Sequence, residues 1–277
     1  MTRAGAVPGA AGVSAGRSER LAARGGALRV ARVWPAVAFG ITGLVLWELV
    51  VVLGRVPAFL LPPPSAIVAQ IGAQAPVIVA TTAVTGGNAA VGLVAGFVLG
   101  VALALLAARS RLFQDLATPV VLAASAVPIV ALAPVFTTMF GSTTEVARRL
   151  VVTVLVIVPV FVSTARGLRQ VQPVHAELMT SLAATPWQHA RFVRLPGAVP
   201  YIMTGLRLAA PAAVIAAIVA EYFGGLQNGL GSRISSAAAN TAYARAWAFV
   251  AASIALGLLF HLAGLLAERL VTRGLRT

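Results

Sequence analysis

The side chains that could carry acid–base or metal chemistry are few in this chain, and they are scattered. It has seven acidic residues, three histidines and no cysteine. His175 and His189 lie in one polar interval and His261 in an apolar run, without a second ligand at helical spacing that would hold a metal. The acidic residues fall about one to a segment, so no carboxylate pair suits glycoside chemistry or a proton relay. We therefore expect no catalytic site, no metal site and no bound cofactor.

The basic residues narrow the function classes further. All 21 are arginines, and they give a formal net charge of +14. The phosphate-binding loop of nucleotidases needs a lysine, so if ATP drives this protein, another chain must hydrolyse it. A nucleic-acid surface is not indicated either, because the arginines alternate with apolar runs and lack interleaved aromatic residues.

Composition identifies an integral membrane protein, since 59% of the residues are hydrophobic and only 10% are charged. We predict an all-α fold with about six transmembrane helices in residues 33–277, preceded by a disordered tail at 1–32. The expected spans are 33–53, 80–107, 116–140, 147–164, 199–222 and 246–266. In the second span, glycines recur at spacings near four, which lets helices approach closely.

Arginine counting predicts the orientation. With both termini in the cytoplasm, about fifteen arginines lie inside and about five outside. Arg148 and Arg149 are the strongest exceptions, because they fall at the outer start of the fourth span. They could meet Glu145 or an acidic patch on a partner, but we favour a solvated helix end. The expected location is the bacterial plasma (inner) membrane, with several passes.

A few polar residues and prolines stand inside the predicted spans. Glu48 is a functional candidate as an intramembrane carboxylate, although a structural role at the outer interface is favoured. Pro128 and Pro134 should kink or break the third span, which then either lines a solute path or is a bent helix without solute contact. Arg207 can extend to the interface or a cavity. With Glu221, these residues complete our candidates for the path: Pro128, Pro134, Arg207 and Glu221.

Residues 168–198 form a polar, basic interval between two apolar runs, which we call the knob. One short helix should begin near Pro173 and present Val174, Leu178 and Leu182 on one face. A second should begin at Thr185-Pro186, where Thr185 and Gln188 have capping-box spacing, and end at Leu195-Pro196. The knob also bears Arg191 and Arg194. The alternative interpretation of these residues is an ordinary polar loop between two spans, since short helices that end at a Leu-Pro pair are common.

The knob resembles the cytoplasmic loop of ABC importer permeases. Glu177, Ala183, Val193, Leu195 and Pro196 stand in the order and spacing of that loop, with Ala183 in place of the family glycine. A left-handed turn at Ala183 would cost about 1 kcal/mol. The segments 200–207 and 220–225 are similar to permeases that import nitrate, sulfonates, taurine and pyrimidine or flavin precursors. The resemblance covers about residues 34–270.

The resemblance implies a type I ABC importer permease fold, and it also implies which partners the chain has. They are two cytoplasmic ABC ATPase subunits that grip the knob, an extracytoplasmic solute-binding protein, and a second permease copy in a homodimer. The implied coupling residues are Glu177, Ala183, Arg191, Val193, Arg194, Leu195 and Pro196. Two other classes remain open: a self-sufficient secondary transporter, which usually shows an internal repeat or intramembrane ionisable pairs, and a membrane scaffold that moves no solute.

Overall fold

The computed structural model describes residues 34–35, 37–223 and 225–274. The predicted tail at 1–32 lies outside these residues. The described chain is helical and contains no strand, as predicted. It divides into two compact units, residues 1–65 and 66–277.

The first unit contains one apolar helix, Val37–Leu53, followed by an irregular segment that returns to the start of α2 (Pro64–Ala73). Glu48 reaches this start. Its carboxylate accepts hydrogen bonds from the Ser65 amide at 3.0 Å and the Ser65 hydroxyl at 2.7 Å. Because the first turn of a helix has amides without intrahelical partners, Glu48 satisfies one of them. This contact at the start of α2 is the kind that a structural role for Glu48 requires.

The second unit is built on two long helices, α3 (Ala75–Arg109) and α6 (Val146–Arg169). Gly96 and Gly100 of α3 face Val156 and Val160 of α6. A Cβ added to Gly96 would lie 2.6 Å from the Val156 Cβ, and one added to Gly100 would lie 3.0 Å from the Val160 Cβ. Larger residues would therefore push the two helices apart. The predicted role of the glycines in close helix approach is confirmed.

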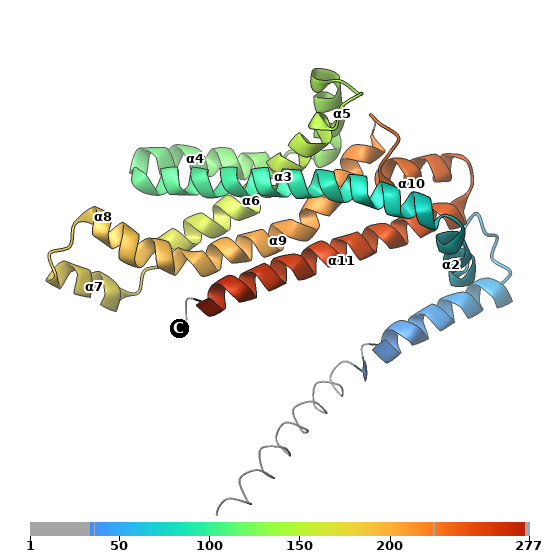
Figure 1. Ribbon diagram of the computed structural model, residues 1–277, viewed down its shortest axis with the longest axis horizontal. Helices are drawn as coiled ribbons and strands as arrows, with labels where there is room; N and C mark the ends of the chain where they lie inside the picture. Colours follow the sequence, from blue (N-terminus) through green and yellow to red (C-terminus); the bar gives the residue numbers. More distant parts are fainter. Residues whose placement is uncertain (1–33, 36, 224, 275–277) are drawn as a thin grey trace, which may run out of the picture. The chain divides into compact units, whose positions relative to one another are not determined.

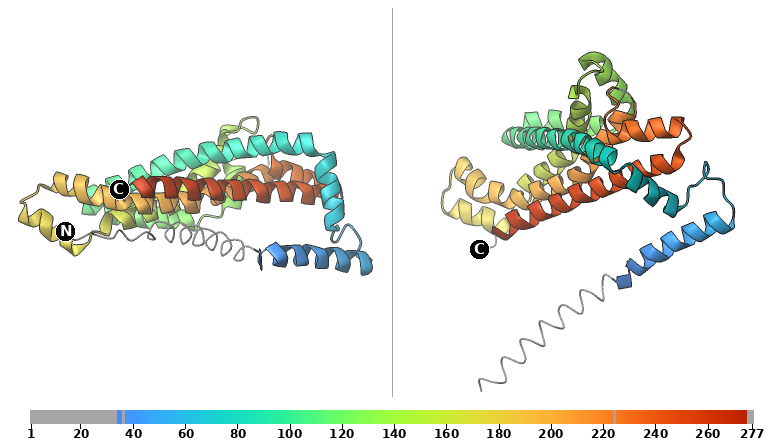
Figure 2. Two further views of the ribbon diagram at one scale, coloured as in Figure 1. Left: turned by 60° about the horizontal axis from the view of Figure 1, so that its bottom comes forward. Right: turned by 45° about the vertical axis from the view of Figure 1, so that its right-hand side comes forward.

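Two more long helices, α9 (Leu195–Tyr222) and α11 (Tyr243–Gly274), pack beside this pair. Figures 1 and 2 show α3, α6, α9 and α11 running alongside one another. Alanines of α9 and valines of α6 fill the core between them. A short helix that we did not predict, α10 (Leu230–Ala239), lies between α9 and α11 in the chain and packs on both.

The predicted third span is not a single helix. It consists of α4 (Arg111–Ser125) and α5 (Ile129–Phe140), and Pro128 stands directly before α5. Proline at this position cannot donate to the preceding turn, so the break expected from the proline pair is confirmed. Within the described residues, four helices are long and apolar enough to cross a membrane: Ala75–Arg109, Val146–Arg169, Pro186–Tyr222 and Tyr243–Gly274. The described first helix and α5 are shorter.

Candidate functional site

The knob contains the two short helical segments expected from its sequence. The first is α7 (Pro173–Ser181), and the second begins as α8 (Pro186–His189). The Thr185 hydroxyl accepts from the Gln188 amide at 3.3 Å, and the Gln188 side chain accepts from the Thr185 amide at 2.7 Å. This reciprocal pair is the predicted capping box. It fixes where the second segment begins.

The joint between the two segments is a tight turn at Ala183. The Ala183 backbone is left-handed, with φ of 50°. Its amide donates to the Thr180 carbonyl, and the Ala184 amide donates to the Met179 carbonyl, both at 3.0 Å. These two bonds end α7 in the pattern that normally places glycine where Ala183 stands. The left-handed turn that the resemblance predicted is therefore present, and Ala183 adopts this backbone conformation although it is less favourable for alanine than for glycine.

One prediction about the knob is wrong, because Leu195-Pro196 does not end the second segment. After α8 the chain makes a π turn, η1 (Ala190–Arg194), and continues without interruption into α9. The Leu195 amide donates to the Ala190 carbonyl, five residues earlier. A proline needs space where the carbonyl four residues before it would stand, and the wider π turn provides that space. The helix from Pro186 to Tyr222 is 37 residues long.

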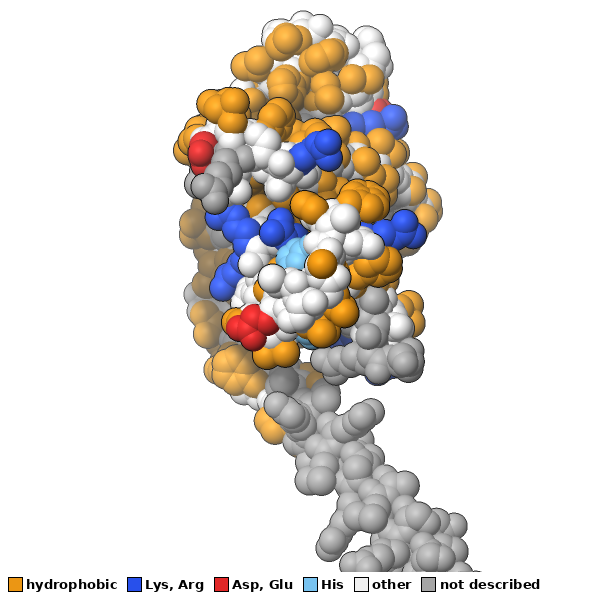
Figure 3. Space-filling model, turned by 90° about the vertical axis from the view of Figure 1, so that its left-hand side faces the viewer, with side chains coloured by type: hydrophobic (Ala, Val, Ile, Leu, Met, Phe, Trp, Pro, Cys, Tyr) orange, Lys and Arg blue, Asp and Glu red, His pale blue; other side chains and the backbone are white. Residues whose placement is uncertain are grey.

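The surface of the knob combines apolar and charged side chains. Five large apolar side chains on it are more than half exposed: Val174, Leu178, Leu182, Trp187 and Phe192. Glu177, Ala183, Arg191, Arg194 and Pro196 are also exposed, whereas Val193 and Leu195 are half-buried. The Arg191 guanidinium lies 5.9 Å from the centre of the Phe192 ring. Figure 3 shows this end of the molecule, where basic side chains surround a histidine and apolar side chains lie between them.

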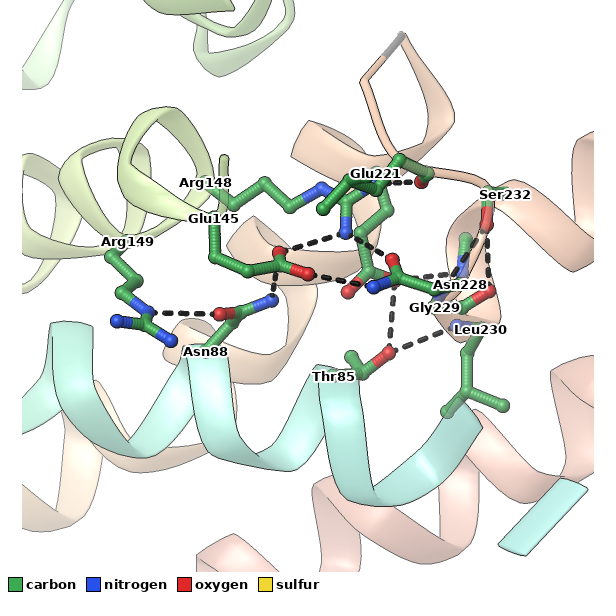
Figure 4. Close-up of polar contacts among 12 residues, drawn as sticks. Thr85, Asn88, Glu145, Arg148, Arg149, Glu221, Asn228, Gly229, Leu230 and Ser232 are labelled. Atoms are coloured by element: carbon green, nitrogen blue, oxygen red, sulfur yellow. Dashed lines mark hydrogen bonds and ion pairs between the residues drawn. The ribbon is translucent and has the colours of Figure 1, made fainter. Parts of the chain in front are cut away.

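The opposite end of α9 carries a different kind of site, which we call the polar cluster. Hydrogen bonds join its members, which are Thr85, Asn88, Glu145, Arg148, Arg149, Glu221, Asn228, Gly229, Leu230, Gly231 and Ser232. Figure 4 shows how the residues that it labels lie. These residues come from α3, from the start of α6, from the end of α9 and from the start of α10 with the loop before it. No short sequence motif unites them.

Glu145 is the centre of one half of the polar cluster. Its carboxylate accepts from Asn88 at 2.7 Å, from Asn228 at 2.8 Å and from Arg148 at 2.9 Å. Burial alone would raise the pKa of Glu145, but the bonds from Asn228 and Asn88 and the Arg148 charge outweigh it, so the pKa is lowered. The ionised carboxylate is therefore the form that this surrounding favours.

Arg148 corrects a second prediction, since it is not part of a solvated helix end. Its side chain is only 3% exposed. Besides Glu145, it donates to the Asn228 side chain at 2.7 Å and to the Leu226 carbonyl. The contact with Glu145, which we considered less favoured, is thus the one that forms. Arg149 is exposed and donates to Asn88 at 3.1 Å.

Glu221 is the centre of the other half. It is fully buried and accepts from the Thr85 hydroxyl at 2.9 Å and from the Gly231 amide at 3.0 Å. The Leu230 amide donates in turn to Thr85 at 2.9 Å. A side chain on Gly229 would overlap the Glu221 carboxylate. The two glycines of Gly229-Leu230-Gly231 therefore admit a buried carboxylate at the start of α10.

The other candidates for the path lie in varied surroundings. Pro128 and Pro134 are exposed at the start of α5 and within it. Arg207 is paired with Glu268 of α11 at 3.1 Å, and Thr204 also donates to Glu268 at 2.9 Å. Glu221, by contrast, is enclosed by protein in this chain. The structure does not bring these four residues together. Glu221 belongs to the polar cluster at the end of α9, whereas Arg207 lies in the first half of that helix.

Residues 96–276 match the family described as the binding-protein-dependent transport system inner membrane component. The match covers more than half of the chain. The protein belongs to this family. Its members are membrane components of transporters, and the chain is a permease subunit of an ABC importer, with the predicted all-α membrane fold.

Individual relatives agree with this assignment. A probable ABC transporter permease protein of Haemophilus influenzae is 33% identical over 175 residues, which are 63% of this permease and 71% of the relative. The riboflavin transport system permease protein RibX of Chloroflexus aurantiacus is 31% identical over 191 residues, or 66% of this permease and 71% of RibX. Among solved structures, the crystal structure of an amino acid ABC transporter with histidines matches with a TM-score of 0.62 at 17% identity. It covers 73% of this permease and 97% of the solved chain, and it shows the fold.

Sequence reasoning located the knob of the permease but missed most of the polar cluster. Thr85, Asn88 and Asn228 were not singled out, because a single threonine or asparagine in or near an apolar run carries no distinctive spacing. One signal was available. A buried carboxylate needs hydrogen-bond donors, and both Glu145 and Glu221 stand at helix ends, so asparagines and backbone amides of the neighbouring loops are candidates for these donors. The matched segment 96–276 contains the whole knob and most of the polar cluster, but it begins after Thr85 and Asn88.

Proposed function

We propose that the knob is the element through which a separate cytoplasmic ATPase drives this permease. An ABC importer permease fold implies ATPase and binding-protein partners. The knob has the surface that such a partner needs. Its large apolar side chains are exposed and are not covered by other parts of this chain. An exposed apolar patch that is rimmed by polar residues is typical of a protein–protein interface.

The observation that carries the proposal is the continuity of the knob with α9. From Pro186 to Tyr222 the chain is one helix of 37 residues, which corresponds to a length of about 55 Å. A helix of this kind transmits a displacement of its first turn to its far end, provided that no flexible joint interrupts it. The π turn keeps the backbone hydrogen-bonded where Pro196 would otherwise break it. Closure of the ATPase subunits at the knob would therefore displace the whole of α9 within the membrane.

Individual residues of the knob take distinct parts in this coupling. Glu177 is exposed on α7 and can receive a basic group of the ATPase. Ala183 sets the angle between the two segments of the knob. Arg191 and Arg194 are polar contacts for an acidic cleft of the ATPase. Val193, Leu195 and Pro196 join the knob to α9.

The remaining features of the assembly follow the same scheme. Both termini and the knob lie in the cytoplasm of a bacterial cell, because this orientation places most arginines inside. The permease acts as a homodimer with the path at its two-fold axis. Pro128 and Pro134, in the broken third span, and Arg207 are candidates to line that path. ATP hydrolysis belongs to the partner subunits.

The transported solute is a small organic molecule delivered by an extracytoplasmic binding protein. The relative RibX is a riboflavin permease, and the segments 200–207 and 220–225 are similar to permeases for sulfonates and for pyrimidine or vitamin precursors. We favour a heteroaromatic vitamin or pyrimidine precursor over a sulfonate such as taurine. Direct binding assays on the cognate binding protein, with riboflavin, a formylated aminopyrimidine and taurine in turn, discriminate between these classes.

The coupling role is tested with the double substitution Glu177→Arg and Leu178→Asp. Both side chains are exposed on α7, so the permease should fold and reach the membrane. We expect the stimulation of ATP hydrolysis by loaded binding protein to be lost in proteoliposomes. A matched control, Arg245→Gln on α11, changes a charge far from the knob and should leave the stimulation intact. Full stimulation in the double variant would exclude the knob as the coupling element.

A further inference from the structure

A cleft of about 420 Å³ lies at the base of the knob, where it meets α3, α4 and α6. One part of its lining is apolar and the other is cationic. The apolar part includes Ala107, Phe161 and Ala165, and the cationic part consists of Arg169 and Arg194 with His189 beside them. The residues that line the cleft include no carboxylate.

The two arginines of the cleft are left without a counter-charge by the chain itself. In the described part of the chain, the ion pairs are Arg148–Glu145 and Arg207–Glu268, and both lie elsewhere. Two guanidinium groups that share one cleft repel each other, and a bound anion would remove that repulsion. The groups are exposed enough to reach such a ligand. Figure 3 shows several basic side chains around a histidine at this end of the molecule, although it labels none of them.

The positions of the apolar and cationic residues along the cleft indicate which kind of anion binds there. Phe161 and Arg169 are eight residues apart in α6, so the lining runs for about 12 Å along the helix axis. Its apolar end points toward the middle of α6, and its cationic end lies at the last turn of α6, beside the knob. A phospholipid has the same polarity, with apolar chains toward the membrane and a phosphate at the surface. A small soluble anion would use only the cationic end.

A second cavity adds room for a headgroup. It has a volume of about 500 Å³, and it shares His189 and Arg194 with the cleft while extending over the knob toward Met179 and Ala183. The two shared residues therefore stand between a space that is partly apolar and a space that opens on the surface. This is the place that a phosphate would occupy between its acyl chains and its headgroup.

We propose that the cleft binds one acidic phospholipid per chain. The phosphate lies among Arg169, His189 and Arg194, because guanidinium groups bind phosphate through paired hydrogen bonds. The first carbons of the acyl chains lie against Ala108 and Ala165, which line the cleft and are not buried, and the headgroup extends into the second cavity. Bound in this way, the lipid joins the end of α6 to the knob. Arg194 then binds the phosphate in addition to its proposed contact with the ATPase, since a guanidinium group has five N–H donors.

The test measures which lipid stays bound to the full-length permease, purified with any ATPase subunits that accompany it. After exchange into an equal mixture of phosphatidylglycerol and phosphatidylcholine, native mass spectrometry counts the retained lipids. We expect phosphatidylglycerol to be retained about tenfold more than phosphatidylcholine, and the double variant Arg169→Gln, Arg194→Gln to lose this preference. The matched control is Arg166→Gln, an exposed arginine one turn earlier on α6 that does not line the cleft, and it should keep the preference.

Two further arms separate a lipid from a soluble phosphate. Glycerol phosphate at millimolar concentration should not displace the retained lipid, because it makes no apolar contact. Ala165→Phe fills the apolar end and leaves both arginines in place, so it should also lower phosphatidylglycerol retention. Unchanged preference in the double arginine variant would overturn the proposal, as would displacement by glycerol phosphate. Because retention is measured without ATP, a failure of the coupling role leaves this result unaffected.

Discussion

The two ends of α9 treat their polar groups in opposite ways. At the knob, Glu177, Arg191 and Arg194 are exposed and form no ion pair within the described chain. At the polar cluster, Glu221 is fully buried and Arg148 nearly so, and their side chains bond to residues of α3, α10 and the loop before it. A group that stabilises the chain has its partners within it, whereas a group that serves a second protein keeps its bonding capacity free. The comparison thus favours an architectural role for the polar cluster, and it supports the contact role that we propose for the knob.

The largest test of this comparison exchanges one arginine at each end for methionine. Arg148→Met removes the cation that is paired with Glu145, which keeps only its neutral donors Asn88 and Asn228, and it takes from the Asn228 side-chain oxygen the donor at 2.7 Å. The free energy of unfolding should fall by about 3 kcal/mol, because breaking a buried ion pair leaves an uncompensated charge. Arg191→Met should change it by less than about 0.5 kcal/mol. Reversible unfolding in mixed micelles measures both, and equal costs at the two ends would refute the distinction.

A second test adds one methyl group at each end. Gly229→Ala places a Cβ against the Glu221 carboxylate, which is enclosed and cannot move away, so we expect a loss of about 2 kcal/mol. Gly197→Ala, just inside α9 beside the knob, meets no atom within 4 Å. It should stabilise the helix by about 0.5 kcal/mol, since alanine is the better helix former. Thermal unfolding of the two variants should therefore shift in opposite directions.

The smallest test concerns the knob alone. Ala183→Gly removes a left-handed alanine and should stabilise the chain by up to about 1 kcal/mol, while Ala184→Gly, whose φ is negative, should not stabilise it. The knob is exposed, so the gain should appear as slower amide exchange in α7 and α8 rather than as a large rise in melting temperature. Faster exchange in Ala183→Gly would show that the alanine holds the joint more firmly than its strain implies.

Predictions that rested on local signals agree with the structure. The capping box at Thr185, the turn at Ala183 and the helix break at Pro128 each depend on residues that are at most a few positions apart. The glycine spacing in α3 also predicted a close helix contact, although it did not identify α6 as the partner. In all these positions, the chemistry of a short stretch determines the backbone that it adopts.

Predictions failed where distant residues or an unusual turn decide the outcome. The burial of Arg148 depends on Asn228, 80 residues away, and the position of Glu221 depends on Thr85, 136 residues away. No local pattern contains these distances. At Leu195-Pro196 the rule that proline ends a helix fails, because the π turn makes room for Pro196 and the helix continues. Such a turn has no sequence signature as clear as the proline itself.

The contact between α3 and α6 limits how the permease can change shape. Gly96 and Gly100 of α3 each accommodate one valine of a row on α6 that repeats every four residues, so the side chains of the two helices interdigitate. Sliding one along the other would require a step of about 6 Å to reach the next matching position. We therefore expect these two helices to move as one rigid body when the permease changes shape. The rearrangement should occur in parts that are not interlocked, such as the broken segment at Pro128.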